Sequence, residues 1–245
     1  MDKKIYETLY KTEENYWWFV GQRFFLDMYL TKYYNHKKNL KLLDVGCGTG
    51  LNLGMLDDFG TAYGIDISDD ALAFCKARGA KNIKKSNVMN IKFKGNMFDV
   101  VTSMGVFYHK NVVDDVKAMK EIYRILKPGG RLFFFDCAMM SLYGKHDIAF
   151  HGMRRYSKNE LKSKLEKSGF VVEKISYINT LFFPLIYIRR KLSNLANSKP
   201  KSDVQEKFNP IVNFILKMIY KTEITGLKYV NYPFGVNIFA VARKR

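Results

Sequence analysis

The sequence contains little that would cross-link the chain or carry it through a membrane. Its three cysteines, Cys47, Cys75 and Cys137, are odd in number and far apart. They form neither a disulfide framework nor a zinc-binding spacing, and they favour a reducing cytoplasm. No apolar run approaches the roughly 18 residues of a membrane-spanning helix, and the first residues lack the apolar core of a signal peptide. We therefore expect a cytoplasmic protein without a metal site.

Acidic residues are scarce as well. The chain carries 23 Asp and Glu against 41 Lys and Arg, a formal net charge of +18. The surplus is uneven: residues 1–150 hold 22 basic and 17 acidic side chains (+5), and residues 151–245 hold 19 and 6 (+13). Such a surplus indicates an anionic partner, which could be RNA, an acidic lipid surface or a phosphorylated substrate. The alternative is a surface that is simply rich in lysine, and charge alone does not decide between the two.

Short apolar runs alternate with amphipathic segments along the chain. We expect strands at Leu40–Val45, Ala62–Ile67, Ile83–Val88, Phe98–Met104, Arg131–Cys137, Val171–Ile178 and Val236–Arg243. Helices are expected at Asp69–Arg78, with Ser68 as its N-cap, at Asp114–Leu126, before Pro128-Gly129-Gly130, and at Lys158–Ser168. Strands that alternate with helices at this spacing predict parallel βαβ units with helices on both faces of the sheet.

The resulting α/β prediction is one Rossmann-like, doubly wound, seven-stranded and mostly parallel sheet whose last strand is antiparallel. Residues 40–178 and 236–245 form its core, residues 1–39 a helical lid, and residues 179–235 a cap inserted between the last two strands. Within the cap, Ser193–Lys207 is polar and is expected to be a mobile loop. Phe182–Ile188, followed by three basic residues, is similar to an interfacial membrane anchor; the alternatives are a cap over the active site or a dimer interface.

Glycines follow the first expected strand at Gly46, Gly48 and Gly50. Without Cβ atoms they allow a sharp turn and let a ligand approach the backbone. The third glycine of a dinucleotide fingerprint is missing, because Leu51 stands in its place. Asp44, just before the loop, disfavours a phosphate and favours a ligand with a cationic amino group. Asp66, 20 residues after Gly46, ends the second strand, where a carboxylate can accept hydrogen bonds from ribose hydroxyls. An adenosine-bearing ligand is therefore expected.

Four segments in this order resemble the class I S-adenosylmethionine (SAM)-dependent methyltransferases of the type 11 kind. They are Leu43–Gly50, Tyr63–Ser68, Phe98–Val101 with His109 beyond it, and Glu121–Gly130. The resemblance covers roughly residues 40–137. It implies that SAM is the cofactor and S-adenosylhomocysteine the product. The cofactor-binding residues that it implies are Asp44, Gly46, Cys47, Gly48, Gly50, Asp66, Ile67, Asn87, Val88 and Met104.

Within that set, the resemblance implies that the backbone of Gly46 and Gly48 contacts the methionine part of SAM and that Asp44 lies close to the amino group of SAM. Asp66 takes the ribose hydroxyls and Ile67 packs on the adenine. Asn87 and Val88 would lie near the adenine amino group, and Met104 near the sulfonium.

Candidate residues for the acceptor and for catalysis lie outside the glycine loop. Trp18, next to Trp17, is expected either to cover the pocket as part of a lid or to staple the first helices to the sheet. Arg154 and Arg155 could hold a phosphate or carboxylate of the acceptor, with Tyr156 beside them. His151 is the first candidate for a general base, followed by His109 and Tyr108. For each histidine the alternative is a structural role.

The expected reaction is O- or N-methylation of a small-molecule or lipid- or saccharide-linked acceptor, which an anionic group could mark. After the fourth strand stands Ser103-Met104-Gly105-Val106, without the prolines of adenine or cytosine amino-methyltransferases and without a Pro-Cys nucleophile. An RNA methyltransferase stays open but is less favoured, because no RNA-binding module is recognisable. A peripheral membrane enzyme that acts on a lipid also stays open, as does a protein of this fold without activity. The sequence does not fix the acceptor or the oligomeric state.

Overall fold

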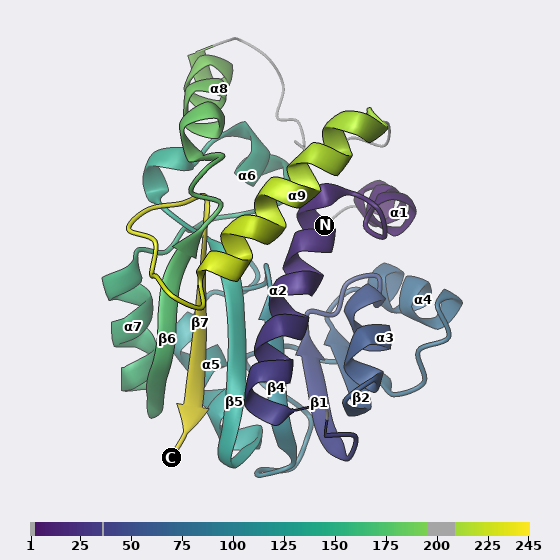
Figure 1. The fold of residues 1–245 in the computed structure, drawn as a ribbon. Helices are drawn as coiled ribbons and strands as arrows, with labels where there is room; N and C mark the ends of the chain where they lie inside the picture. Colours follow the sequence, from purple (N-terminus) through teal and green to yellow (C-terminus); the bar gives the residue numbers. More distant parts are fainter. Residues whose placement is uncertain (1–2, 36, 196–208) are drawn as a thin grey trace.

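The computed structural model describes residues 3–35, 37–195 and 209–245, and its strands form one seven-stranded sheet (Figure 1). The strands are β1 (Leu40–Val45), β2 (Gly60–Asp66), β3 (Ile83–Lys85), β4 (Phe98–Met104), β5 (Leu126–Cys137), β6 (Phe170–Ile178) and β7 (Asn237–Lys244). Their order across the sheet is β3-β2-β1-β4-β5-β7-β6. All neighbours pair in parallel except β7, which is antiparallel to both β5 and β6. The predicted fold class, with its antiparallel last strand, is confirmed.

Helices cover both faces of the sheet, as a doubly wound fold requires. They are α1 (Lys3–Thr12), α2 (Trp17–Tyr34), α3 (Leu51–Asp57), α4 (Asp69–Ala77), α5 (Asp115–Ile125), α6 (Lys145–Ala149), α7 (Lys158–Lys167), α8 (Phe183–Leu195) and α9 (Pro210–Gly226). On one face, α2, α3 and α9 pack over aromatic side chains such as Phe133 and Phe239. On the other, α5 and α7 pack over residues such as Phe134 and Ala240. The side chains of neighbouring strand residues alternate between these two cores.

Local signals explain the helix starts. The Ser68 hydroxyl accepts a hydrogen bond from the Ala71 N–H at 3.4 Å and caps α4, as predicted. Asp114 does the same for α5, accepting from the Lys117 N–H at 2.9 Å. Each cap satisfies a backbone donor that the first helical turn leaves free.

Two strands differ from the sequence prediction by three or more residues, whereas the other strand ends agree within two. β3 is only three residues long, because after Lys85 the chain turns and the Asn90 N–H bonds to the Asn87 carbonyl at 2.9 Å. Asn87 and Val88 therefore lie in a turn. β5 begins at Leu126 rather than at Arg131, and it runs through the Pro128-Gly129-Gly130 segment with a bulge in its pairing to β4. Gly129, at φ +77°, allows that irregular strand start.

The segments before and after the core are helical. α1 and α2 precede β1, and α8 and α9 lie in the predicted cap. Of the expected loop Ser193–Lys207, the first three residues belong to α8, and the remainder lies outside the described residues. In the part of the chain that the structure describes, no helix combines the length and the apolar character needed to cross a membrane.

Candidate functional site

A cavity of about 640 Å³ opens at the carboxyl ends of β1, β2, β4 and β5. This is the edge at which open α/β sheets bind ligands, since their strand-to-helix loops converge there. The glycine loop and the β2 end form one part of the wall. The N-terminal helices, the residues that follow β4 and β5, and the two cap helices form the remainder.

The glycine loop is held against β2 by its own backbone. The N–H groups of Gly46 and Cys47 both donate to the Ile65 carbonyl, at 2.7 and 3.0 Å. A Cβ on Gly46 would lie 2.4 Å from a Val106 methyl carbon, so only glycine fits there. Gly48 has φ +55° and lines the cavity, and no atom lies within 4 Å of the place where its Cβ would be. The bare backbone at Gly48 thus forms a cradle that a side chain would fill.

Asp66 ends β2 beside this cradle. Its two carboxylate oxygens accept from the Gly48 N–H at 3.0 Å and from the Ser68 N–H at 2.9 Å. Burial raises the pKa of the Asp66 carboxyl, and these backbone donors oppose the rise. Each carboxylate oxygen has a further lone pair, which can accept a hydrogen bond from a ligand hydroxyl. Next to it, Ile67 lines the cavity with a side chain that is 47% exposed, which offers a free apolar surface to a flat ring.

Of the other predicted cofactor residues, Asp44 and Gly50 lie behind the cavity wall, and the remaining four line the cavity. Asp44 lies in β1 behind the lining and accepts from the Thr102 hydroxyl at 2.6 Å. Burial raises the pKa of Asp44 to about 7. Gly50, at φ +85°, caps α3 and packs on Cys75, whereas Cys47 lines the cavity with its sulfur 3.7 Å from that of Cys75. Asn87, Val88 and Met104 also line the cavity.

The turn between α1 and α2 closes over the glycine loop. The buried Glu13 carboxylate accepts from the Thr49 hydroxyl and from Arg78, the residue that follows α4. Burial raises the pKa of Glu13, and Thr49 and Arg78 oppose the rise. Tyr6 of α1 also lines the cavity, and burial together with the nearby Asp66 raises its pKa to about 12. The sequence prediction missed these contacts, and the only signal for them was the acidic pair Glu13-Glu14 at a helix end.

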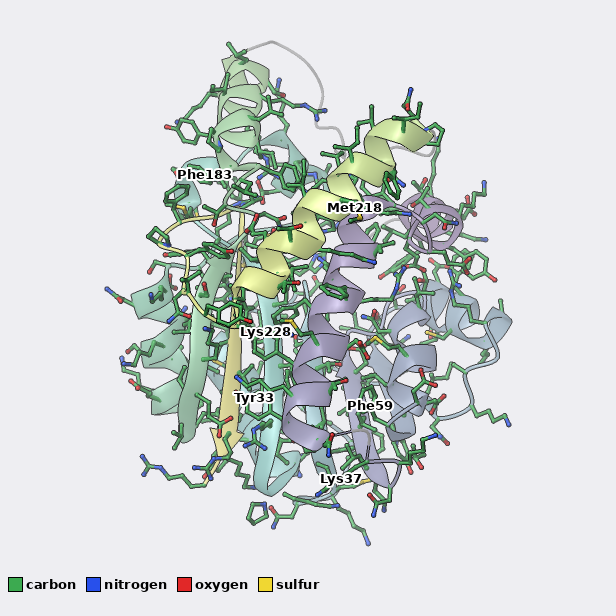
Figure 2. The ribbon with its side chains drawn as sticks, in the orientation of Figure 1. Tyr33, Lys37, Phe59, Phe183, Met218 and Lys228 are labelled. Atoms are coloured by element: carbon green, nitrogen blue, oxygen red, sulfur yellow. The ribbon has the colours of Figure 1, made fainter. Side chains whose placement is uncertain are left out.

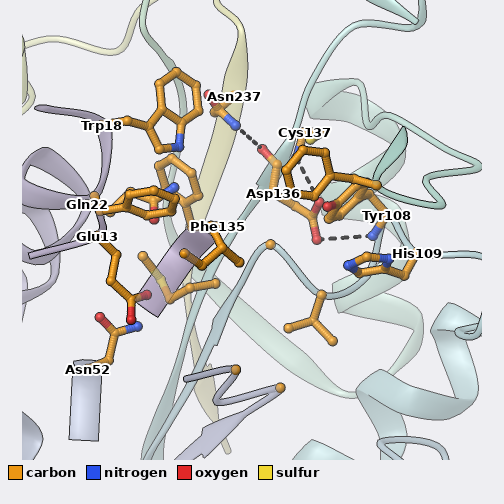
Figure 3. Close-up of a pocket in the computed structure, with 18 of the residues that line it drawn as sticks. Glu13, Trp18, Gln22, Asn52, Tyr108, His109, Phe135, Asp136, Cys137 and Asn237 are labelled. Atoms are coloured by element: carbon orange, nitrogen blue, oxygen red, sulfur yellow. Dashed lines mark hydrogen bonds between the residues drawn. The ribbon is translucent and has the colours of Figure 1, made fainter. Parts of the chain in front are cut away.

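Aromatic side chains also line the cavity, and Trp18, Tyr108 and Phe135 are labelled in Figure 3. Trp17 is buried against Phe182, with ring centroids 4.9 Å apart, and Trp18 meets Trp17 edge-on at 5.3 Å. Both tryptophans line the cavity, and both also pack on Tyr220 of α9, so the contacts that they make beyond the cavity are with the cap. Phe150 adds a further aromatic wall.

Asp136, at the end of β5, was not singled out in the sequence. Its buried carboxylate accepts from the backbone N–H groups of Phe107 at 2.7 Å, Tyr108 at 3.2 Å and Cys137 at 2.7 Å. Burial raises the pKa of Asp136 to about 7. Asn237 of β7 donates to the Asp136 backbone carbonyl at 3.3 Å (Figure 3). These bonds fix the loop after β4 that carries Tyr108 and His109.

The structure separates the predicted catalytic residues. Tyr108 and His109 line the cavity, with ring centroids 4.2 Å apart. Burial lowers the pKa of His109 to about 4, so its imidazole is neutral near pH 7. His151 is not part of the lining, and its backbone carbonyl accepts from the Lys110 N–H at 2.9 Å. It thus supports the loop next to His109.

The structure also separates the predicted acceptor residues. Arg154 lies 3.3 Å from the Asp115 carboxylate, and the Tyr156 hydroxyl donates to the same group at 2.9 Å; neither residue lines the cavity. Arg155 does line it, but its guanidinium pairs with Asp147 at 2.8 Å, where both side chains are buried. Two other arginines, Arg189 and Arg190 of α8, line the cavity at the cap, and a sequence signal for them existed in the basic run after Phe182–Ile188.

Comparisons with known proteins agree with this architecture. A family model described as a methyltransferase domain matches residues 43–134. An uncharacterised protein of Methanocaldococcus jannaschii is 35% identical over 63% of this chain and 64% of its own length. A demethylmenaquinone methyltransferase of Staphylococcus epidermidis is 31% identical over 61% of this chain and 68% of its length. The chain spans less than two thirds of the archaeal relative and about half of several others.

A solved structure shares the fold along most of the chain. It is a SAM-dependent methyltransferase of Mesorhizobium loti, with a TM-score of 0.59 and 15% identity over 89% of this chain and 96% of its own. The match to the family model ends before the cap, so the glycine loop and Asp66 lie inside it, and α8 and α9 lie outside.

Proposed function

The chain belongs to the class I SAM-dependent methyltransferases, and from this premise we propose that it moves a methyl group from SAM to a largely apolar small-molecule or lipid-linked acceptor. The observation that carries the proposal is a single cavity that is lined both by the glycine loop and Asp66 and by aromatic side chains. A cofactor and an acceptor can therefore meet in one space, away from bulk water.

The part of the cavity that the glycine loop, Asp66 and Ile67 line, here named the cofactor half, has the chemical groups that SAM requires. When bound, SAM supplies a methyl group on a sulfonium, which is an excellent leaving group. Gly48 leaves room for the methionine part, and Asp66 accepts the ribose hydroxyls. Ile67 supports the adenine on its exposed apolar side. Glu13 and the helices that it joins then cover the site.

The remainder of the cavity, here named the acceptor half, is lined by aromatic side chains and by α8. It favours an apolar molecule with a polar or anionic end. Trp18, Phe150 and Phe182 offer flat apolar faces, and Arg189 lies at the cap side of the same cavity. An RNA acceptor would need a groove of exposed cations along its backbone, which walls of this kind do not offer. The acceptor in the staphylococcal relative's name, a demethylmenaquinone, is compatible with an apolar acceptor here.

If the nucleophile carries a proton, His109 is the group that we propose accepts it. The imidazole lines the cavity, and its low pKa keeps it neutral and able to accept a hydrogen bond. Tyr108 packs on this ring and limits its rotation. His151 acts on the reaction through the backbone bond to the same loop.

Cofactor binding is tested by calorimetry with S-adenosylhomocysteine. We expect Asp66→Ala to weaken binding by about 10- to 100-fold, because two hydrogen bonds to a charged group are lost. Asp69→Ala is the matched control, since Asp69 lies three residues on, is exposed and pairs with Lys85. Binding that is equal in both variants, or absent from the unsubstituted protein, would refute the assignment of the site.

The acceptor class is tested with SAM that carries a radiolabelled methyl group. The protein is incubated with an organic-solvent extract of cells and, separately, with the water-soluble metabolites and the RNA. We expect label in the organic-phase fraction, and less of it with His109→Asn than with His151→Asn. Label only in the water-soluble or RNA fraction would contradict an apolar acceptor.

A further inference from the structure

The outer side of α8 is apolar although it faces solvent. Leu185, Ile188 and Leu192 recur at helical spacing, so they lie on one side of the helix. All three are exposed, and Ile188 is 57% exposed. A helix at the surface of a soluble domain normally presents polar residues there. Packing within the described residues does not account for this apolar stripe.

The N-terminal half of α9 repeats the pattern. Its inner side packs on α2 and is fixed by Asn213, whose side chain bonds to the Trp17 N–H and to the Asn15 carbonyl, both at 2.9 Å. Its outer side exposes a second apolar stripe, in which Phe214 is 63% exposed. The members of this stripe are Ile211, Phe214, Ile215 and Met218, and Met218 is labelled in Figure 2.

Both stripes are next to the mouth of the cavity. Figure 1 draws α8 and the N-terminal half of α9 above the sheet, with α8 rising away from the core. Leu185 and Arg189 of α8 and Val212 of α9 line the cavity itself. The exposed apolar surface is therefore continuous with the walls of the proposed acceptor half.

Charge indicates what covers this surface. The described residues of α8 and α9 carry Arg189, Arg190, Lys191, Lys217 and Lys221 against a single acid, Glu223. Glu223 is buried and accepts from the Thr180 N–H at 2.8 Å. Arg190 is largely buried and lies 3.5 Å from the Asp147 carboxylate, so the positive charge of this surface comes from the other basic residues. An isologous contact between two copies would bring these cations together on a chain of net charge +18. Anionic lipid headgroups complement them instead.

We propose that α8 and the N-terminal half of α9 form a docking surface for an anionic lipid bilayer. The leucine, isoleucine, phenylalanine and methionine side chains enter the interface, and the lysines and the exposed Arg189 meet the headgroups. Docking itself does not depend on methyl transfer. Its consequence, that an apolar acceptor passes from the bilayer into the cavity between the two helices, rests on the proposed function.

Vesicle flotation tests the proposal with the full chain. Vesicles of phosphatidylcholine alone are compared with vesicles that also contain phosphatidylglycerol. We expect flotation with the anionic vesicles, weakened but not abolished by salt. Ile188→Asp and Phe214→Asp should each lower the bound fraction by about tenfold or more, because each exchanges a large apolar side chain for a charge that bilayer headgroups repel.

Ala73→Asp is the matched control, since it adds the same charge at an exposed position of α4, outside the cap. Flotation should be unchanged in this variant. Absence of flotation, or an equal loss in Ala73→Asp, would overturn the proposal. So would self-association in sedimentation that Phe214→Asp abolishes while no vesicles are bound, because the surface would then join two copies.

Calorimetry with S-adenosylhomocysteine on the same variants separates the docking proposal from the proposed methyltransferase function. Ile188 and Phe214 are outside the cofactor half, so we expect their substitution to leave cofactor affinity unchanged. Flotation without cofactor binding would refute the proposed function and leave docking intact. Cofactor binding without flotation would do the reverse.

Discussion

The guanidinium of Arg78 lies 3.0 Å from the Glu13 carboxylate and joins α4 to the turn between α1 and α2. The same guanidinium lies 2.7 Å from the Glu14 carboxylate and 4.3 Å from the centre of the Tyr10 ring. Glu13 in turn accepts from Thr49 in the glycine loop. One arginine thus fastens the N-terminal helices over the proposed cofactor site.

Replacing Arg78 should loosen this cover. In Arg78→Met, a largely buried carboxylate loses its cation, which we expect to cost about 1 to 3 kcal/mol of stability. Because the closed form becomes less populated, affinity for S-adenosylhomocysteine should fall by about five- to tenfold. Urea unfolding and calorimetry measure the two effects, with Lys76→Met on the same helix as the control. Equal cofactor affinity in both variants would show that the cover does not depend on Arg78.

Alanine substitutions at Gly48 and Gly129 test whether the ligand approaches the Gly48 backbone. Both have positive φ, +55° and +77°, and at both positions a Cβ would point into open space. An alanine should cost each about 1 to 2 kcal/mol of stability through the left-handed backbone alone. Only Gly48 lines the cavity. We therefore expect Gly48→Ala to lower affinity for S-adenosylhomocysteine by about tenfold or more, with no change in Gly129→Ala. A similar affinity in both variants would mean that the ligand does not approach the Gly48 backbone.

Asp44 should make stability depend on pH. Burial raises its pKa in the folded protein to about 7, above the ordinary value of 3.8. The folded state therefore binds the proton more tightly, so the contribution of Asp44 to stability is fully present below the unfolded pKa and is lost as pH rises through 7. Asp44→Asn removes this dependence. Between pH 5 and 8 we expect the variant to gain about 2 to 3 kcal/mol relative to the unsubstituted protein.

Urea unfolding at several pH values, without cofactor, measures that difference. Asn can still accept the hydrogen bond that the Thr102 hydroxyl donates, so the variant is expected to fold. Asp57→Asn, which removes a carboxylate at an exposed position at the end of α3, is the control. Parallel profiles for Asp44→Asn and the unsubstituted protein would mean that Asp44 is ionised throughout this range.

Local patterns in the sequence predict the sheet and the place of the cofactor loop. Gly46, Gly48 and Asp66 are recognisable because each follows the end of a strand, and the ends of parallel strands meet at one edge. The length of β3 was not predictable in the same way. Its residues Lys84 and Lys85 are exposed at the sheet edge, so no apolar alternation marks where pairing ends.

Partners that are distant in sequence account for what the pattern could not predict. Glu13 and Arg78 are 65 residues apart, and Asp136 binds backbone N–H groups almost 30 residues away. No spacing rule connects such groups, because only the packed fold brings them together. Arg154 and Arg155 illustrate the same limit. Their sequence resembles an anion-binding pair, yet each has a carboxylate of this chain beside it.

Arg155 and Arg189 line the same cavity and should differ in what they do. The Arg155 side chain is buried, pairs with Asp147 and donates to the Ala138 carbonyl at 2.8 Å. Arg155→Met leaves a buried carboxylate with less compensation, so we expect a loss of about 3 to 5 kcal/mol in the free energy of unfolding. Arg189→Met, at an exposed position of α8, should cost clearly less stability than Arg155→Met but lower methyl incorporation into the organic-phase acceptor.

Urea unfolding and the radiolabel assay distinguish the two roles. Asp147→Leu combined with Arg155→Met should recover part of the stability that the single Arg155 variant loses, because the uncompensated charge is removed. Arg190 also lies 3.5 Å from Asp147, so the recovery should be incomplete. An Arg155→Met protein that is as stable as the unsubstituted one, yet incorporates less label, would return Arg155 to the acceptor-binding role that the sequence indicated. The free energy of unfolding of Arg155→Met therefore distinguishes a structural role for Arg155 from an acceptor-binding role, even before the acceptor is known.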